Sequence, residues 1–333
     1  MKSYHFAVVG ATGLVGRTFL KVMEEYHLPV ASLRCFASEK SQGMKLPFDG
    51  KEWEVETLKE GCFKGVDFAL FSAGASISHQ WAPLAAKEGA IVIDNSSEWR
   101  MDPCCALIVP EINLDDYRTH SSIIANPNCS TIQSVLPLKA LDNAFKLLRV
   151  TYSTYQAVSG SGKKGIDDWK RCESGEEAQF YPYNIAQTCI PEIDVGMENG
   201  YTKEEMKMVN ETRKILHRPD LSVSATCVRV PVPIGHVVSI QAEFQKPFEL
   251  DEVRKILSSF PGIRVVDDLT THRYPVSILA KGNDFVYVGR IRKDLARENS
   301  LLLYCVADNV RKGAASNAVQ IAKAIIEREE ENV

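Results

Sequence analysis

The first part of the chain alternates short apolar runs with segments in which apolar residues recur every three or four positions. Residues 5–9 form the first run, and a turn rich in glycine connects it to residues 17–26. That second segment places several apolar side chains on one helical face, namely Phe19, Leu20 and Met23. Further apolar runs, with helical stretches such as 81–88 between several of them, occupy residues 33–37, 68–71, 91–93 and 123–125. Strands that alternate with helices predict a doubly wound parallel sheet with helices on both faces.

From about Leu147 onward, the apolar runs become longer and the regular helical crossovers disappear. The β-rich stretches are residues 148–158, 222–244, 276–279, 285–290 and 301–306. Residues 250–260 and 313–328 have helical spacing, and the polar and aromatic segment 164–183 is expected to form a lobe or loop. This pattern predicts a second, α+β domain built on a largely antiparallel or mixed sheet.

These two patterns predict two domains. The first covers residues 1–129, and the C-terminal helix within residues 309–333 is expected to complete it. The second covers residues 130–308. A chain of 333 residues is long enough for two domains with cores of ordinary size.

The composition narrows the possible partners and the cellular setting. Hydrophobic residues make up 45% and charged residues 25%, as in a globular protein that works in water. A net charge of -4 without long runs of one sign gives no reason to expect nucleic acid or a membrane as partner. No segment approaches the roughly 18 apolar residues of a membrane span, and the N-terminus lacks a signal-peptide pattern. Nine scattered cysteines favour a reducing, cytoplasmic setting and argue against disulfides or a metal site.

The glycine-rich turn at residues 10–16 has the spacing G-x-x-G-x-x-G. Glycines allow a sharp turn and a close approach to a pyrophosphate, and the helix that follows directs its free N–H groups at that anion. The candidate cofactor-binding residues of this turn are Gly10, Thr12, Gly13, Leu14, Val15 and Gly16. A tight turn without a ligand is the alternative, but a position directly after the first strand favours a Rossmann-like dinucleotide site.

The end of the second strand bears on the choice between NAD and NADP. Ser38, Lys40 and Ser41 suit the 2′-phosphate of NADP. Glu39 would repel a phosphate if it pointed inward, so acceptance of NAD stays open, and Lys40 could also be a solvated surface lysine. Small or polar residues end a later strand as well, and these add Ser72 and Gly74 to the candidate cofactor contacts.

The candidate nucleophile is Cys129, which follows a strand and begins an apolar helix. The positive end and free N–H groups of a helix stabilise a thiolate and lower the pKa of the thiol. The same N–H groups could stabilise an oxyanion. A small, inert buried cysteine is the alternative, but Pro127 before it and polar residues on both sides favour catalysis.

A thiolate nucleophile needs a partner that accepts and donates protons. His236 is the best candidate because Arg229, two prolines and a glycine precede it and present the imidazole rigidly. A histidine in an edge strand is the alternative interpretation.

Motifs along nearly the whole chain resemble those of the aspartate-β-semialdehyde dehydrogenase family. They are GATGLVG, ASEKSQG, FSAG, DNSSEWR, NPNCSTIQ, STYQAVSG, TKEEMK, SATCVRVPVPIGH, VGRIRKD and DNVRKGAASNAVQIA. The resemblance implies NADPH-dependent reduction of aspartyl 4-phosphate to aspartate semialdehyde, with phosphate released, in lysine, threonine and methionine biosynthesis. It also implies that residues 130–308 carry catalysis and dimerisation, and that the enzyme is a homodimer or homotetramer.

The resemblance assigns roles to individual residues. Cys129 would form the thioester, His236 would exchange the proton, and Gln156 would orient the acyl intermediate. Arg229 would bind the substrate α-carboxylate and Glu204 its α-ammonium. The phosphate would be bound by Lys207, Arg100 and Asn128, and further cofactor contacts would come from Ser159, Gly160 and Asn309. Without the resemblance, residues 202–207 would be interpreted as a capped, solvated helix start.

Two departures from the family pattern concern the subunit contact, namely a shorter segment at 164–183 and the pair Gln187–Thr188. The nearest alternative function is N-acetyl-γ-glutamyl-phosphate reductase, which has NPGCYPT where this chain has NPNCST. A cysteine-dependent hydrolase or acyltransferase is an alternative of another class, and a non-catalytic dinucleotide sensor is a third.

Overall fold

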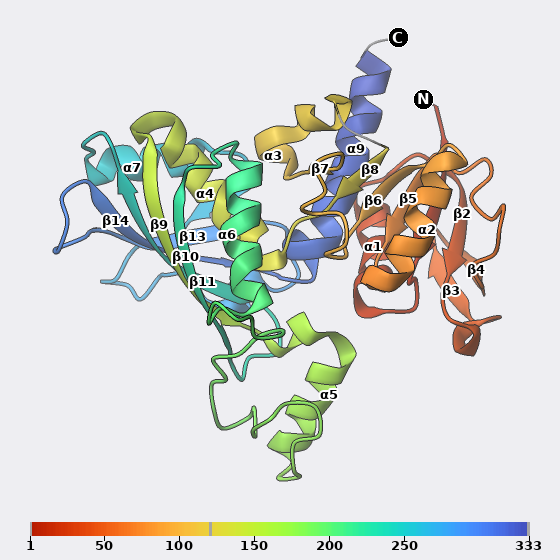
Figure 1. The fold of residues 1–333 in the computed structure, drawn as a ribbon, viewed down its shortest axis with the longest axis horizontal. Coiled ribbons are helices and arrows are strands. Elements are labelled where there is room, and N and C mark those ends of the chain that lie inside the picture. The colour runs from red at the N-terminus through yellow and green to blue at the C-terminus, as the bar shows by residue number, and fades with distance from the viewer. Residues whose placement is uncertain (1, 120–121, 332–333) are drawn as a thin grey trace. The chain divides into compact units, whose positions relative to one another are not determined.

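The computed structural model describes residues 2–119 and 122–331. The last two residues of the expected C-terminal segment 309–333 therefore lie outside the described residues. It divides into two compact units (Figure 1). Unit 1 comprises Met1–Pro127 and Ala314–Val333, and unit 2 comprises Asn128–Gly313. Each unit is built on its own sheet.

Unit 1 contains an eight-stranded sheet in the order β3-β4-β2-β1-β5-β6-β8-β7. Apart from β3, which pairs antiparallel with β4, neighbouring strands are parallel, so the predicted parallel sheet is confirmed. The strands are β1 (Tyr4–Val9), β2 (Val30–Phe36), β3 (Lys45–Phe48), β4 (Lys51–Glu56), β5 (Phe68–Phe71), β6 (Ile91–Asp94), β7 (Ala106–Leu107) and β8 (Ile123–Ala125). The β3–β4 hairpin was not predicted, because charged residues alternate with its few apolar ones at this edge.

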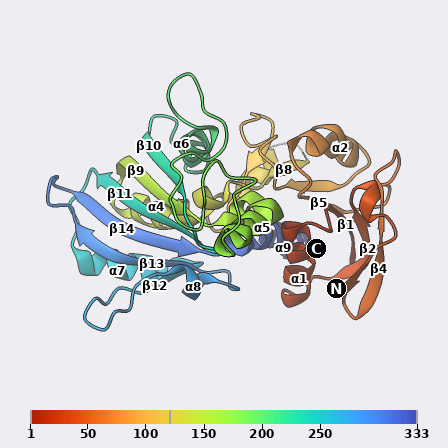
Figure 2. The same cartoon turned by 90° about the horizontal axis from the view of Figure 1, so that it is seen from below.

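Helices cover both faces of this sheet, as predicted. Phe6 and Val8 of β1 belong to one apolar cluster with residues of α1 (Leu14–Glu25) and α9 (Ser316–Glu331). The alternate residues Ala7 and Val9 belong to a second cluster with α2 (Ala75–Lys87). Figure 2 shows α2 on the opposite side of the sheet from α1 and α9. Shorter helical turns are η1 (Glu39–Ser41), α3 (Pro110–Asn113) and η2 (Leu114–Thr119).

Unit 2 contains a six-stranded mixed sheet in the order β10-β9-β11-β14-β13-β12, as predicted. Its strands are β9 (Leu147–Gln156), β10 (Ser222–Arg229), β11 (His236–Phe244), β12 (Ile263–Val265), β13 (Val286–Lys293) and β14 (Ser300–Ala307). The central strand β11 runs antiparallel to both β9 and β14. Helices α4 (Cys129–Phe145) and α7 (Leu250–Ser259) pack on this sheet, and α6 (Lys203–Ile215) packs against β10 and α4.

Two sequence-based expectations for unit 2 need correction. Residues 276–279 were expected to be a strand, but α8 (Ser277–Ala280) is a short helix. Its apolar Ile278 is 83% exposed, so apolar content at this place does not mark a buried strand. Residues 164–183 include a helix, α5 (Gly162–Glu173), after the turn η3 (Val158–Ser161). Charged residues surround its few apolar residues, Ile166, Trp169 and Cys172, which pack in an apolar cluster with Val158, Ile185 and Ile190. The buried carboxylate of Asp168 accepts hydrogen bonds from the N–H groups of the loop that follows.

All nine cysteines are free thiols. Within residues 2–119 and 122–331, no helix combines the length and the apolar character that crossing a membrane requires. The same part of the chain contains no cluster of three or more His, Cys, Asp and Glu side chains that could hold a metal ion.

Candidate functional site

The nucleophile candidate Cys129 is the first residue of α4, as the sequence predicts for a helix start. Its N-cap is Asn128, whose Oδ1 accepts hydrogen bonds from the N–H groups of Ser130 (2.9 Å) and Thr131 (3.3 Å). The side chain of Asn128 therefore occupies two of the N–H groups that could otherwise have donated hydrogen bonds to an oxyanion. The thiol is partly exposed, whereas the two residues after it are fully buried.

Asn128 is also held by two buried carboxylates of α6. Its backbone N–H donates to Oε2 of Glu211 at 2.6 Å, and its Nδ2 donates to Oε1 of Glu204 at 2.8 Å. Glu204 and Glu211 are seven residues apart and therefore lie on the same face of the helix. Helix α6 thus fixes the residue that precedes the nucleophile.

Glu204 joins three of the predicted site residues. Its carboxylate also accepts hydrogen bonds from Nε2 of Gln156 (3.1 Å) and from Nζ of Lys207 (3.1 Å). Burial alone would raise the pKa of Glu204, but the charge of Lys207 and the hydrogen bonds from Asn128, Lys207 and Gln156 lower it below its usual value. Glu204 therefore stays ionised although its side chain is buried.

Lys207 has a second acidic partner. Its Nζ donates to Oδ2 of Asp194 at 2.7 Å. Burial lowers the pKa of Lys207, but Glu204 and Asp194 together raise it above the ordinary value. The lysine is a fixed positive charge at neutral pH.

His236 is fully buried at the first residue of β11. Its Nδ1 accepts a hydrogen bond from the backbone N–H of Ala157 at 3.0 Å. Because Nδ1 is an acceptor, the ring proton lies on Nε2, for which the described residues provide no hydrogen-bond partner. Burial and the nearby charge of Arg229 place the pKa of His236 well below its ordinary value, so the ring is neutral at physiological pH.

Gly160 provides the space in which Arg229 and His236 meet. A Cβ at this position would lie 2.7 Å from Nη1 of Arg229 and 3.0 Å from Nε2 of His236. Arg229 is buried at the end of β10, and its Nη1 donates to the carbonyl of Ala157 at 2.7 Å. The backbone of Ala157 therefore binds the guanidinium through its carbonyl and the imidazole through its N–H.

Ser159 and Asn309 stabilise the turn before His236. Asn309 Nδ2 donates to Oγ of Ser159 at 3.0 Å, and its Oδ1 accepts from the N–H of Gly235 at 2.9 Å. Ser277 Oγ donates to the carbonyl of Gly235 at 3.0 Å. Ser159 and Asn309, which the resemblance predicts as cofactor contacts, thus lie in the hydrogen-bond network of the turn that precedes the histidine.

In unit 1, the glycine turn has the geometry that close packing of backbone requires. Gly10 has a φ of +84°, and a Cβ there would lie 2.5 Å from the carbonyl oxygen of Ser72. A Cβ at Gly16 would lie 2.1 Å from the carbonyl oxygen of Gly10. The N-cap of α1 is Gly13, which has no side chain to cap the helix, so the first N–H groups are available to an anion.

The remaining predicted cofactor residues lie around this turn. Oγ1 of Thr12 lies 3.4 Å from Oγ of Ser41, which brings the glycine turn to η1. Ser38 is the N-cap of η1, and Lys40 is exposed there. Gly74 is the N-cap of α2 with a φ of +89°. The residues in unit 1 therefore fit a dinucleotide with a phosphate near η1.

Arg100 also belongs to unit 1, where it is buried. Its Nε donates to the carbonyl of Asn126 and its Nη2 to the carbonyl of Asn95, both at 3.0 Å. Unit 2 by itself brings together Asn128, Gln156, Glu204 and Lys207, and separately brings Arg229 to His236.

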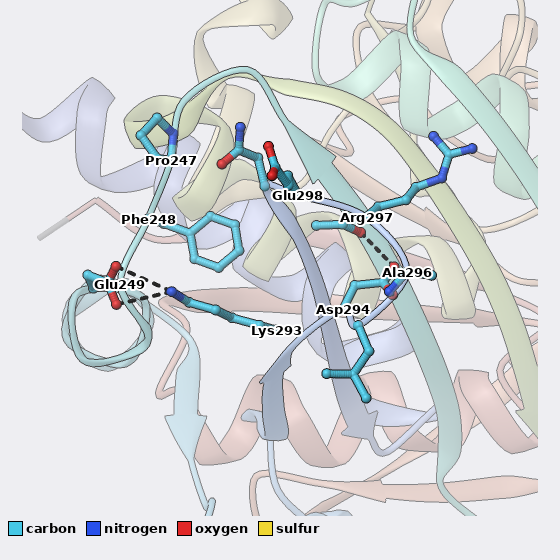
Figure 3. Close-up of a pocket in the computed structure, with 11 residues that line it drawn as sticks. Pro247, Phe248, Glu249, Lys293, Asp294, Ala296, Arg297 and Glu298 are labelled. Atoms are coloured by element: carbon cyan, nitrogen blue, oxygen red, sulfur yellow. Dashed lines mark hydrogen bonds and ion pairs between the residues drawn. The ribbon is translucent and has the colours of Figure 1, made fainter.

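A hollow of about 430 Å³ lies elsewhere in unit 2, between residues 247–249 and the turn that connects β13 and β14 (Figure 3). Its member Ser300 pairs with Glu243, whereas His236 pairs with Ala307, so the hollow lies at the opposite end of β11 and β14 from the histidine. Lys293 in its wall binds Glu249 at 3.2 Å (Figure 3). It contains none of the predicted site residues.

Sequence reasoning missed several residues of the site. Glu211 follows Lys207 by four positions and Glu204 by seven, so helical spacing could have revealed it. The pairing of Asp194 with Lys207 has no sequence signal, because it depends on a loop. Gly313, whose added Cβ would lie 2.9 Å from Cβ of Cys129, is far away in the chain.

Comparisons with known proteins agree along the whole chain. A family model described as "Semialdehyde dehydrogenase, NAD binding domain" matches residues 5–120, and one described as "Semialdehyde dehydrogenase, dimerisation domain" matches residues 138–312. The aspartate-semialdehyde dehydrogenase of Aquifex aeolicus is 54% identical over 97% of this chain and 98% of its own. That of Campylobacter jejuni is 46% identical over 98% of both chains. The crystal structure of aspartate semialdehyde dehydrogenase II from Vibrio cholerae complexed with ASA has a TM-score of 0.94 at 43% identity, covering 98% of this chain and 99% of that one.

The buried, neutral state of His236 predicts how stability depends on pH. In the unfolded chain a histidine has a pKa of about 6.5, and in the folded chain the pKa of His236 is well below that. The unfolded state therefore binds the extra proton first, and the free energy of unfolding falls as the pH drops below about 6.5. Urea denaturation between neutral and mildly acidic pH should show a smaller fall for His236→Asn than for the wild type. Parallel pH curves for the two proteins would contradict a neutral His236.

The space at Gly160 predicts a steric cost for a single methyl group. Gly160→Ala must displace Arg229 or His236 and should lower the free energy of unfolding by about 1–3 kcal/mol. Gly196→Ala is the matched control, because an added Cβ meets nothing within 4 Å there and the φ is not positive. Chemical denaturation of both variants measures the difference, and equal stabilities would show that the close packing at Gly160 is absent in solution.

Proposed function

Because the chain belongs to the aspartate-semialdehyde dehydrogenase family, we propose that it reduces L-4-aspartyl phosphate to L-aspartate 4-semialdehyde with NADPH. Phosphate is released, and the product serves lysine, threonine and methionine biosynthesis. The observation that supports this most directly is Cys129 at the first residue of α4, in the same unit as His236, Gln156 and Arg229. A thiolate is favoured at a helix N-terminus.

Cys129 carries the covalent chemistry in this proposal. Its sulfur attacks the acyl carbon of the substrate, and the carbon–oxygen bond to phosphate breaks as the thioester forms. When bound, NADPH supplies the hydride that reduces the thioester carbonyl. The carbon–sulfur bond then breaks, the aldehyde is released, and the sulfur leaves as a thiolate that the N-terminus of α4 stabilises.

His236 acts on the oxygen of the reacting carbonyl. Because Nδ1 accepts the N–H of Ala157, the neutral ring offers its proton from Nε2. This N–H donates to the oxygen when negative charge develops there. Gln156 orients the acyl group, and its own amide is oriented by Glu204.

The polar side chains around Asn128 and Arg229 bind the amino acid and the phosphate. Arg229 takes the α-carboxylate because a guanidinium forms two parallel hydrogen bonds to a carboxylate. Glu204 takes the α-ammonium. Lys207, with Asn128 of the same unit, binds the phosphate. Two of the three N–H bonds of the Lys207 ammonium serve Glu204 and Asp194, which leaves one for the ligand.

NADPH is the cofactor that the residues of unit 1 fit. The N-terminus of α1, which begins after Gly13, receives the pyrophosphate. Ser38, Lys40 and Ser41 of the segment around η1 receive the 2′-phosphate, and Thr12 lies beside Ser41. The free state of all nine cysteines supports a cytoplasmic location.

A second copy of this chain is the partner that we propose for the sheet of unit 2. Helix α4 packs on β9, β11 and β14, whose alternate residues are fully buried, whereas several of the residues between them are half-buried or exposed. The half-buried residues are Thr151, Ser153, Ser239, Gln241, Leu302 and Tyr304. Because the matching family model is described as a dimerisation domain, we place the subunit contact of a homodimer on this face.

The decisive experiment is an assay of NADP reduction with aspartate semialdehyde, in the presence and absence of phosphate. Cys129→Ser should reduce kcat by at least about a thousandfold, because a hydroxyl is a poor nucleophile at neutral pH. Cys104→Ser, at an exposed cysteine, is the matched control and should keep full activity. Mass spectrometry of the wild type trapped with substrate should locate the acyl group on Cys129.

The same assay with N-acetylglutamate semialdehyde separates the nearest alternative. A preference for the acetylated aldehyde would favour the reductase of that substrate. Activity that survives Cys129→Ser, or turnover without a need for phosphate, would refute the proposed mechanism.

If the half-buried face of the unit 2 sheet forms the subunit contact, a charge on this face should disrupt the dimer. Leu302→Glu places a charge in the middle of this face and should convert the dimer to a monomer, as measured by light scattering after size-exclusion chromatography. Met44→Glu is the control, because Met44 is an exposed apolar residue of unit 1 and does not belong to the sheet of unit 2. A Leu302→Glu variant that remains dimeric at low concentration would place the contact elsewhere.

A further inference from the structure

Gln133 lies one helical turn after Cys129 in α4 and is fully buried. Residues four positions apart lie on the same face of a helix, so Gln133 faces the same side as the nucleophile. A buried glutamine is costly unless its amide forms hydrogen bonds. Neither the family resemblance nor the proposed mechanism gives it a role.

The amide of Gln133 reaches the strand that carries the histidine. Its Nε2 donates to the carbonyl oxygen of His236 at 3.1 Å and to the carbonyl oxygen of Cys305 at 3.3 Å. His236 is the first residue of β11, and Cys305 lies in the neighbouring strand β14. A single side chain therefore connects the helix of the nucleophile to the start of the strand that presents the imidazole.

The other contacts of His236 come from elements outside that helix. Ala157, after β9, binds the ring at Nδ1. Asn309 and Ser277 bind the backbone of Gly235. Among these hydrogen bonds of Gly235 and His236, the one from Gln133 to the carbonyl oxygen of His236 originates on the helix of Cys129.

The geometry points to Gln133 as a positioning residue that sets His236 relative to Cys129. This inference rests on the proposed function of these two residues. Proton donation to a developing oxyanion requires the donor nitrogen within hydrogen-bond distance, and an error of about 1 Å in such a site can reduce the rate about a hundredfold. Gln133 would limit such errors because it binds the backbone of His236 directly.

Gln133→Met tests the inference, because methionine fills a similar volume but donates no hydrogen bond. We expect kcat to fall about tenfold to a hundredfold, while KM for aspartate semialdehyde changes by less than about threefold. Gln133→Glu should lower kcat further, because a carboxylate would face two carbonyl oxygens. If the methionine variant does not fold, Gln133→Asn, which keeps the amide but is one methylene too short, provides the same comparison.

Ser134→Ala is the matched control. Ser134 is the next residue, is also fully buried, and donates from Oγ to the carbonyl of Ser130 within α4. Its removal costs a buried hydrogen bond of similar size and a contact with the side chain of Cys305, which Gln133 also contacts, but leaves the bond to His236 in place. A merely structural role of Gln133 predicts equal losses of kcat in the two variants, and that result would overturn the inference.

NMR of isotope-labelled histidine provides a readout that does not depend on turnover. The wild type should show one His236 signal set, protonated at Nε2 and assigned by its loss in His236→Asn. Gln133→Met should shift or broaden that set, and Ser134→Ala should leave it unchanged. An unaltered His236 signal in Gln133→Met would refute the positioning role, whereas a wild type that lacks activity with aspartate semialdehyde would refute the proposed function.

Discussion

Burying a charged carboxylate is unfavourable unless hydrogen bonds and an opposite charge compensate it. The site in unit 2 depends on the groups that compensate the buried carboxylate of Glu204. Its partners are the amides of Asn128 and Gln156 and the ammonium of Lys207. Each partner is thereby fixed in orientation. Since Asn128 also caps α4, the compensation of one buried charge determines the position of the helix that carries Cys129.

The site combines groups of fixed charge with one neutral group. Glu204 and Lys207 keep their charges because each stabilises the other, and the pKa of each is displaced away from neutrality. His236 is kept neutral by burial and by the charge of Arg229. The fixed charges and the neutral hydrogen-bond donor therefore belong to different residues, and a change in pH near neutrality alters neither.

The fold could be predicted from the sequence wherever the pattern was periodic. The strands β5 and β8 coincide with short, continuous apolar runs and the helix α7 with apolar residues at helical spacing, and the order of such segments indicates the parallel and the mixed sheet. The helix α5 did not, because charged residues surround its narrow apolar stripe of Ile166, Trp169 and Cys172, and the hydrogen bonds of Asp168 to the following loop have no sequence signal. The segment 276–279 failed for the opposite reason, since its apolar residues are exposed.

Site residues could be proposed from the sequence alone only where the local context has a chemical meaning, as with Cys129 at a helix start and His236 after Arg229, two prolines and a glycine. The roles of Glu204 and Lys207 needed the family resemblance, because their sequence context is that of a solvated helix. The contacts of Ala157 and Asp194 could not be predicted at all. They depend on backbone groups or loops that come together only in the folded chain.

The hydrogen bond from Ala157 to Nδ1 has a consequence for the supply of protons. An imidazole often passes a proton from one ring nitrogen to the other, taking it up on one side and releasing it on the opposite side. In His236, Nδ1 already accepts a hydrogen bond from the backbone N–H of Ala157, so a proton cannot pass through the ring from one nitrogen to the other. Loss of the Nε2 hydrogen would leave an imidazolate, because Nδ1 carries no proton, so toward a ligand this imidazole is a hydrogen-bond donor and not a proton carrier.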